Sequence, residues 1–304
     1  MHTHGPWVFW KDLKGPVGKL IDRFVFPPKT IDTLLKAYLP KTNASNVAIG
    51  LCNYTADRFV GVTQEVAESA DERKRLKGDF PISDIDTTSS DYFIGFKTSQ
   101  GKEFYIVKGQ EPHLPQGHLL LLPLKQNIET KKPSGEYKTP QELAQDAKDS
   151  DPNTLVFATH PGMKLSLAER IALRMIGEPS NETLGLTLES LTQLAEKGLL
   201  DGTEEYNSGA GAHNYEIGIT TDTLQLTHPT PTIACSDTMY SDNILTSYNI
   251  MNLDFSNPDA LSKSIRNSLD SRKLISRGFL KSSKLKQLRH FLIHAVTPHS
   301  HDYL

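Results

Sequence analysis

Histidine and acidic residues that could bind divalent cations occur at intervals along the whole sequence. Imidazole nitrogens and carboxylate oxygens suit Zn²⁺, Mn²⁺ and Fe²⁺, and a carboxylate can also bridge two cations. The residue types therefore indicate a metal site formed by distant parts of the chain. The candidate ligands are His2, His4, Glu111, His118, His160 and Asp237.

Most of these candidates lie beside short apolar runs that predict buried strands. The runs cover residues 46–52, 104–107, 118–122, 155–159 and 232–235. Glu111 follows the second run and His118 begins the third, whereas His160 and Asp237 follow the fourth and the fifth. Active sites of α/β folds lie at the carboxyl ends of strands. We therefore expect these side chains to meet at one edge of a sheet.

Helical patterns alternate with the apolar runs. The sequence Thr139-Pro140-Gln141-Glu142 is typical of a helix N-cap followed by proline, and it predicts a helix that extends to about Lys148. Helices are also predicted over 166–175 and 188–200, and loops over 64–90 and 125–138. This alternation favours a largely parallel sheet with crossover helices.

Each candidate ligand also has an ordinary structural interpretation when it is considered alone. His2 and His4 could be surface residues of a terminus, His118 a hydrogen-bonded histidine of a core strand, and Asp237 a helix N-cap. His113, two residues after Glu111, could share its face and act as a ligand, but it is interpreted as a surface histidine. The function therefore depends on the whole set of residues.

The order of these motifs resembles the polymerase and histidinol phosphatase (PHP) family over roughly residues 2–240. The resembling pieces are HTH at 2–4, GHLLLL at 117–122, THPG at 159–162, EEYN at 204–207 and CSD at 235–237. The resemblance implies a distorted seven-stranded (β/α) barrel of the TIM-like type. It also implies a metal-dependent hydrolase that acts on phosphate esters or nucleic-acid phosphodiesters.

The resemblance also implies two overlapping sets of metal ligands and a pair of zinc, manganese or iron ions. One set is His2, His4, Glu111 and Asp237; the other is Glu111, His118 and His160, with Glu111 as the bridge and Glu204 nearby. Three histidines of the family are missing together, in segments 5–10, 49–54 and 236–239. In trinuclear members they belong to a third metal, so their joint loss predicts a dinuclear centre. The family usually has a hydrophobic strand before HxH, where this sequence has only Met1; either that strand is truncated, the true start lies upstream, or the barrel is incomplete there.

Two divalent ions about 3.5–4 Å apart can clamp a phosphoryl group and activate water. In this mechanism Glu111, Asp237 and Glu204 belong to the catalytic centre. His213 and His228 are candidates for protonating the leaving group, and Lys164 and His228 for binding the substrate. All three also fit ordinary surface positions.

The segment 256–304 is predicted to form basic helices that pack on or extend a hydrolase domain at 1–255. Between 258 and 289 it has nine basic residues, opposed by two aspartates. They could bind a polynucleotide backbone or form the solvated face of helices. The substrate is accordingly predicted to be a phosphorylated small molecule, a nucleotide or a nucleic acid.

The composition excludes several classes of protein. The chain has 304 residues, a net charge of −3 and 37% hydrophobic residues, so it does not attract polyanions as a whole. No apolar run approaches the ~20 residues of a membrane span, and the start lacks a signal-peptide core. A cytoplasmic enzyme without a membrane partner is expected, and Cys52 and Cys235 form no CxxC pair. The alternatives are a non-catalytic PHP-like binding or assembly module and a metal hydrolase of C–N or C–O bonds.

Overall fold

The computed structural model describes a little over half of the chain. The described residues are 2–3, 46–53, 90–97, 103–165, 170, 184–207, 210, 213–235, 247–249, 251–270 and 275–277. His4 and Asp237 lie outside these residues, and so do the helix predicted over 166–175 apart from Arg170 and the loop predicted over 64–90 apart from Ser90.

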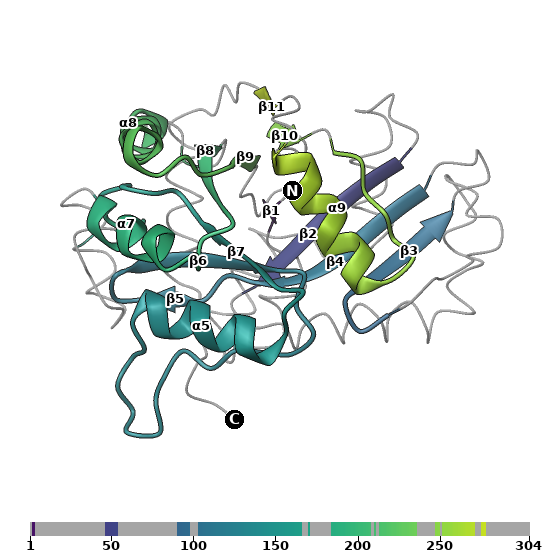
Figure 1. Ribbon diagram of the computed structural model, residues 1–304, viewed down its shortest axis with the longest axis horizontal. Helices are drawn as coiled ribbons and strands as arrows, with labels where there is room; N and C mark the ends of the chain where they lie inside the picture. Colours follow the sequence, from purple (N-terminus) through teal and green to yellow (C-terminus); the bar gives the residue numbers. More distant parts are fainter. Residues whose placement is uncertain are drawn as a thin grey trace, which may run out of the picture.

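The described elements form a mixed α/β fold (Figure 1). The strands are β1 (His2–Thr3), β2 (Asn46–Asn53), β3 (Phe93–Lys97), β4 (Glu103–Gln110), β5 (His113–Leu114), β6 (Gly117–Leu122), β7 (Leu155–Ala158), β8 (Gly202–Asn207), β9 (Thr232–Cys235), β10 (Ser247–Asn249) and β11 (Ile275–Arg277). The helices are α5 (Pro140–Ser150), α7 (Leu188–Glu196), α8 (Asn214–Thr227) and α9 (Pro258–Asp270).

A curled sheet connects most of the strands in the order β1-β2-β4-β6-β7-β8-β9, with β3 on β4 and β5 on β6. The pairs β1–β2, β2–β4, β7–β8 and β8–β9 are parallel. However, β6 is antiparallel to both of its neighbours, β4 and β7. The sheet is therefore more mixed than the alternation of patterns predicts. Within the described residues no pairing of β9 with β1 closes it into a seven-stranded barrel.

Hydrophobic layers cover both faces of this sheet. Leu119 and Leu121 of β6 belong to a core with α5, α7 and α8, whereas Leu120 belongs to a second core with α9. Successive strand residues point to opposite faces, so α5, α7 and α8 cover one face and α9 covers the other. At about 25 cal/mol per Å² of buried apolar surface, these two layers dominate the stability of the sheet.

The helix predicted at 140–148 is confirmed as α5. The Thr139 hydroxyl accepts a hydrogen bond from the Glu142 N–H, and the Glu142 carboxylate accepts one from the Thr139 N–H, which together form a capping box. Lys132 Nζ lies 2.8 Å from Glu142 Oε1. The Lys132 ammonium, followed by the Thr139 N–H, lowers the pKa of Glu142 from 4.5 to about 2.

Glu142→Gln should therefore make the thermal stability less dependent on acid pH. A carboxyl group whose pKa is lowered by folding stabilises the fold above its unfolded value of 4.5, and this contribution is lost as the pH falls towards about 2. The wild-type protein should melt higher than the variant at pH 6, and the difference should shrink towards pH 2. Melting curves from pH 2 to pH 7 test this, and a constant difference would contradict it.

Other sequence predictions differ in their outcome. The helix predicted over 188–200 is observed as α7, which is shorter than predicted. It ends at Glu196, and Gly198, with a φ of +65°, lies two residues beyond this end. The helical interpretation of the C-terminal segment is confirmed for α9, but residues 275–277 form β11, which pairs antiparallel with β10. No helix in the described ranges combines the length and apolarity that a bilayer crossing requires.

Candidate metal centre

The chain that leaves β4 continues as one arm of a β-hairpin. Gln110 pairs with Leu121, and His113 and Leu114 of β5 pair with His118 and Gly117 of β6. These three pairs belong to one register, so the arm keeps the same register from Gln110 to Leu114. Pro115 and Gln116 form the two-residue loop of the hairpin.

This register decides which side chains share a face. His113 lies directly opposite His118, and Glu111 lies two residues before His113, so all three are on the same face of the hairpin. Leu114 and Leu119 belong to the opposite face, where they are buried in the core with α5 and α7. Burial of these leucines therefore fixes the direction of the Glu111, His113 and His118 side chains.

The antiparallel direction of β6 explains how a histidine at the start of a strand reaches an edge where other strands end. Because β6 is antiparallel to β7, its first residues lie beside the end of β7, where Leu119 pairs with Ala158. His118 is the second residue of β6, and His160 follows β7 by two residues. The two imidazoles therefore approach the same point from adjacent strands.

The Glu111 carboxylate lies between these two imidazoles. Its Oε1 atom is 3.4 Å from His118 Nδ1 and 3.2 Å from His160 Nε2. Glu111, His118 and His160 expose only 1%, 6% and 3% of their surface. A buried carboxylate is costly unless it is paired with a charge or coordinates a metal, and a cation held by these three side chains would be such a partner.

His160 is held by a strained turn. Its φ of 30° is the one positive φ among the non-glycine residues that the structure describes, and it belongs to the sparsely occupied left-handed region. Gly162, at φ +72°, continues the turn and donates its N–H to Leu186 O at 2.9 Å. Backbone strain of this kind persists where the surroundings determine the geometry, often at functional sites.

Glu204 supports the same turn from β8. It is fully buried, and its Oε2 accepts hydrogen bonds from the His160 N–H at 2.6 Å and from Asn207 Nδ2 at 3.0 Å. Thr221 of α8 donates its hydroxyl to Glu204 O at 2.9 Å. Glu204 thus acts on the site by positioning the backbone of His160.

His113 differs from its interpretation as a surface histidine. It is half-buried rather than a surface residue, and its ring stacks on the His118 ring with a centroid distance of 3.7 Å and an interplanar angle of 13°. Glu111, His113 and His118 each offer a ligand atom, and these atoms all lie within 4.8 Å of one another. The two-residue spacing from Glu111, combined with the Leu-Pro-Gln-Gly turn, was the available signal.

The donor set at this point fits a divalent transition metal. It consists of imidazole nitrogens and one carboxylate, which suit zinc, manganese and iron better than the all-oxygen sites of calcium or magnesium. Glu111, His118 and His160 are buried and His113 is half-buried, and the elements that carry them are held in place by both hydrophobic cores. Glu111, His113, His118 and His160 are therefore the described residues that could bind a metal here.

The structure describes little of the other predicted metal ligands, His2, His4 and Asp237. β1 places the backbone of His2 opposite Gly50 of β2, in a parallel pair. The His2 side chain, His4 and Asp237 lie outside the described part of the chain, and β9 ends two residues before Asp237. Whether these residues join Glu111 stays a prediction.

The predicted substrate residues separate into two places. His213 Nδ1 is 2.9 Å from Glu216 Oε2, and the Lys164 N–H is 3.4 Å from the same oxygen, so these two residues are neighbours at the start of α8. His228 is at the other end of α8, 4.0 Å from Glu196. A helix of this length spans about 20 Å, so His228 does not join His213. The sequence analysis also did not predict α8.

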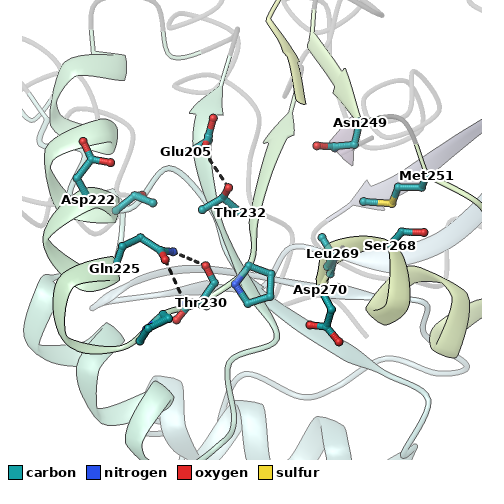
Figure 2. A pocket seen from close by; sticks show the side chains of 13 residues that line it. Glu205, Asp222, Gln225, Thr230, Thr232, Asn249, Met251, Ser268, Leu269 and Asp270 are labelled. Atoms are coloured by element: carbon teal, nitrogen blue, oxygen red, sulfur yellow. Dashed lines mark hydrogen bonds between the residues drawn. The ribbon is translucent and has the colours of Figure 1, made fainter. Parts of the chain in front are cut away.

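A cavity of about 700 Å³ lies between α8, the β8–β9 edge and α9 (Figure 2). None of Glu111, His113, His118 and His160 is among its lining residues. Its lining includes Glu205, Asp222 and Asp270, and no lysine, arginine or histidine among the thirteen described residues that form it. Three carboxylates without a basic group repel a phosphate. The described lining of this cavity therefore does not favour a phosphorylated substrate.

The chain shows only weak similarity to known proteins. No protein-family model and no curated protein matches the chain. Among solved structures, PsfC from Pseudomonas syringae is 14% identical with a TM-score of 0.44, over 88% of this chain and 90% of PsfC. A two-domain protein from Bacteroides vulgatus, described as containing a predicted PHP-like metal-dependent phosphoesterase, is 14% identical with a TM-score of 0.41, over 96% of this chain and 67% of its own. Similarity this weak assigns neither a fold nor a function to this chain.

Proposed function

We propose that the protein is a metal-dependent hydrolase of phosphate esters, with its active site at Glu111, His118 and His160. The observation that carries the proposal is the position of the Glu111 carboxylate, which is buried within 3.4 Å of imidazoles from two different strands. Two imidazoles and a carboxylate provide the three protein ligands that a catalytic zinc-type site uses.

Each residue has a distinct task in this proposal. Glu111, His118 and His160 hold the metal, and Glu204 fixes the turn that carries His160 through the hydrogen bond from the His160 N–H. When bound, divalent cations at such a site polarise the phosphoryl group and acidify water. The protein supplies a rigid and buried frame, so little reorganisation is needed during the reaction.

The PHP resemblance extends this site to a dinuclear centre in a seven-stranded barrel. His2, His4 and Asp237 would bind the second ion together with Glu111, and zinc, manganese or iron would fill both positions. Two features support this arrangement. The strands from β1 to β9 form one continuous sheet. In addition, β1 contains His2, while β9 ends just before Asp237.

A small phosphate ester is the proposed substrate in preference to a polynucleotide. The basic residues that the structure describes in α9 are already paired with carboxylates. Arg266 Nε is 3.3 Å from Asp201 Oδ1, and Lys263 Nζ is 2.7 Å from Asp259 Oδ2. Such pairing fits the solvated outer face of a helix better than a phosphate-binding stripe.

Metal analysis of the full-length protein should give about two equivalents of metal, and Asp237→Ala should reduce this to about one. The phosphoesterase activity of this variant should be at least about 100-fold lower than that of the wild type, as expected when one charge-stabilising group is removed. Its circular dichroism spectrum should be unchanged. The substrates tested in the activity assay should include an aryl phosphate, a nucleoside monophosphate and a single-stranded oligonucleotide.

Asp222→Ala, an exposed aspartate of α8, is the matched control and should behave as the wild type. Protein that binds no metal would be a non-catalytic module, and the proposal would then be wrong. Protein that binds metal but cleaves only amide or carboxylic ester substrates would be a hydrolase of C–N or C–O bonds.

A further inference from the structure

We infer that His113 is itself a metal ligand, so that the hairpin from Glu111 to His118 forms a three-ligand site within eight residues. This inference rests on the proposed metal-dependent function. It goes beyond the family pattern, which assigns no role to a histidine two residues after the glutamate.

The pairing register brings the three donors together without help from distant segments. His113 and His118 are directly paired across the hairpin, and Glu111 precedes His113 on the same face. Directly opposed residues of an antiparallel pair have Cβ atoms about 4.5–5.5 Å apart. Two histidines in this position can therefore direct their ring nitrogens to one point, and Glu111 approaches this point from the same side.

The distances are close to those of a metal site. The ligand atoms of Glu111, His113 and His118 lie within 4.8 Å of one another. Zn–N distances of about 2.0–2.1 Å in a tetrahedral site correspond to ligands about 3.4 Å apart. Closing this gap takes about 1 Å per atom, which side-chain rotation can provide without moving the backbone.

The hairpin backbone is fixed by its surroundings. Gly117 has a φ of +129°, and a Cβ atom there would lie 2.5 Å from Leu186 N, so glycine is required at this turn. Leu114 packs in the core on the opposite face. A rigid turn and an anchored leucine keep His113 and His118 opposed whether or not a ligand is bound, which is the preorganisation that metal sites use.

Stacking of His113 on His118 has an alternative explanation as simple aromatic packing. The two explanations differ in what they require of residue 113. Packing needs a flat ring, whereas coordination needs a ring nitrogen. Phenylalanine keeps the ring and lacks the nitrogen, so His113→Phe separates the two roles.

The experiment measures Zn²⁺ affinity of the full-length protein by competition with a chromophoric chelator. Loss of a group that merely hydrogen-bonds to a ligand costs about 10–100-fold in affinity. We therefore expect His113→Phe and His118→Phe each to weaken binding of the tightest Zn²⁺ by at least about 100-fold. His228→Phe, at the far end of α8, should bind as the wild type.

The outcomes separate the inference from the proposed function. A His113→Phe variant that binds Zn²⁺ within about threefold of the wild type, while His118→Phe loses it, would overturn only the role of His113. A wild-type protein that binds no Zn²⁺, Mn²⁺ or Fe²⁺ would overturn the proposed function and the inference with it. Metal binding that depends on His113 without any phosphoesterase activity would support the inference and contradict the proposed reaction.

Discussion

Glu111→Gln should remove metal from the site and lower phosphoesterase activity by at least about 10³-fold. The amide has the size of the carboxylate but no charge, and it replaces an acidic group that contacts both His118 and His160. Removal of a single charge-stabilising donor from an active site costs about 10²–10³-fold. Loss of the residue that holds the ion should cost more.

Thermal stability provides a second measurement that does not depend on a substrate. A ligand at 100 times its Kd stabilises the folded protein by about 2.7 kcal/mol. Adding Zn²⁺ or Mn²⁺ should therefore raise the Tm of the wild type and leave that of Glu111→Gln unchanged. In the absence of metal the variant should be at least as stable, because a buried charge has been removed.

Glu205→Gln is the matched control for this substitution. Glu205 is adjacent to Glu204 on β8, but it lines the separate cavity and accepts a hydrogen bond from the Thr232 hydroxyl (Figure 2). This variant should keep both its metal and its activity. If Glu111→Gln also kept them, Glu111 would not be a ligand and the candidate site would be wrong.

The strands were the most predictable part of the fold. Apolar runs such as those of β4, β6, β7 and β9 differ from their surroundings in hydrophobicity, which a single sequence displays directly. The helix α5 was predictable for a similar reason, because Thr139 and Pro140 mark its start. In each case the signal is local, and the same residues that reveal the element also stabilise it.

The direction of β6 could not be predicted in this way. Leu119, Leu120 and Leu121 are all buried, so the run has no alternation that shows which face points where. The pairing of β6 with Gln110 belongs to the short hairpin, but its pairing with β7 joins Leu119 to Ala158, which lies far beyond the hairpin in the sequence. Its antiparallel direction is nevertheless what brings His118 to the end of β7, and therefore to His160.

The helix α8 was missed because its sequence lacks a clear apolar stripe. Ile217, Thr221 and Leu224 are its buried residues, whereas Tyr215, Ile219 and Leu226 are large and exposed. Apolar side chains are thus distributed around the helix, which weakens the 3.6-residue pattern on which a prediction depends. His213, which the sequence places only as a candidate proton donor or a surface residue, is the N-cap of α8.

The candidate site shows a similar division between local and distant information. That Glu111 and His118 belong together follows from a hairpin of eight residues, because the register relates them directly. Contact with His160 depends on the pairing of β6 with β7 and on a turn that only the folded chain defines. The Glu204 contact to the His160 backbone has no signature in the sequence beyond the type of residue.

Gly185→Ala tests whether the turn at His160 is packed as tightly as the structure indicates. A Cβ atom at residue 185 would lie 1.9 Å from His160 O and 3.0 Å from Gly162 N. Both are backbone atoms, so neither can move aside as a flexible side chain would. Overpacking of this kind costs about 1–3 kcal/mol or more, and we expect a lower Tm to report it.

The same substitution should lower activity well beyond its effect on stability. To accommodate the methyl group the turn must shift, and a displacement of about 1 Å at a catalytic group can cost about 10²-fold in rate. Gly218→Ala is the control, because nothing lies within 4 Å of its Cβ position in α8. There alanine should stabilise the helix by up to about 1 kcal/mol. Equal behaviour of the two variants would show that Gly185 does not hold His160 in place, and the role assigned to the turn would have to be abandoned.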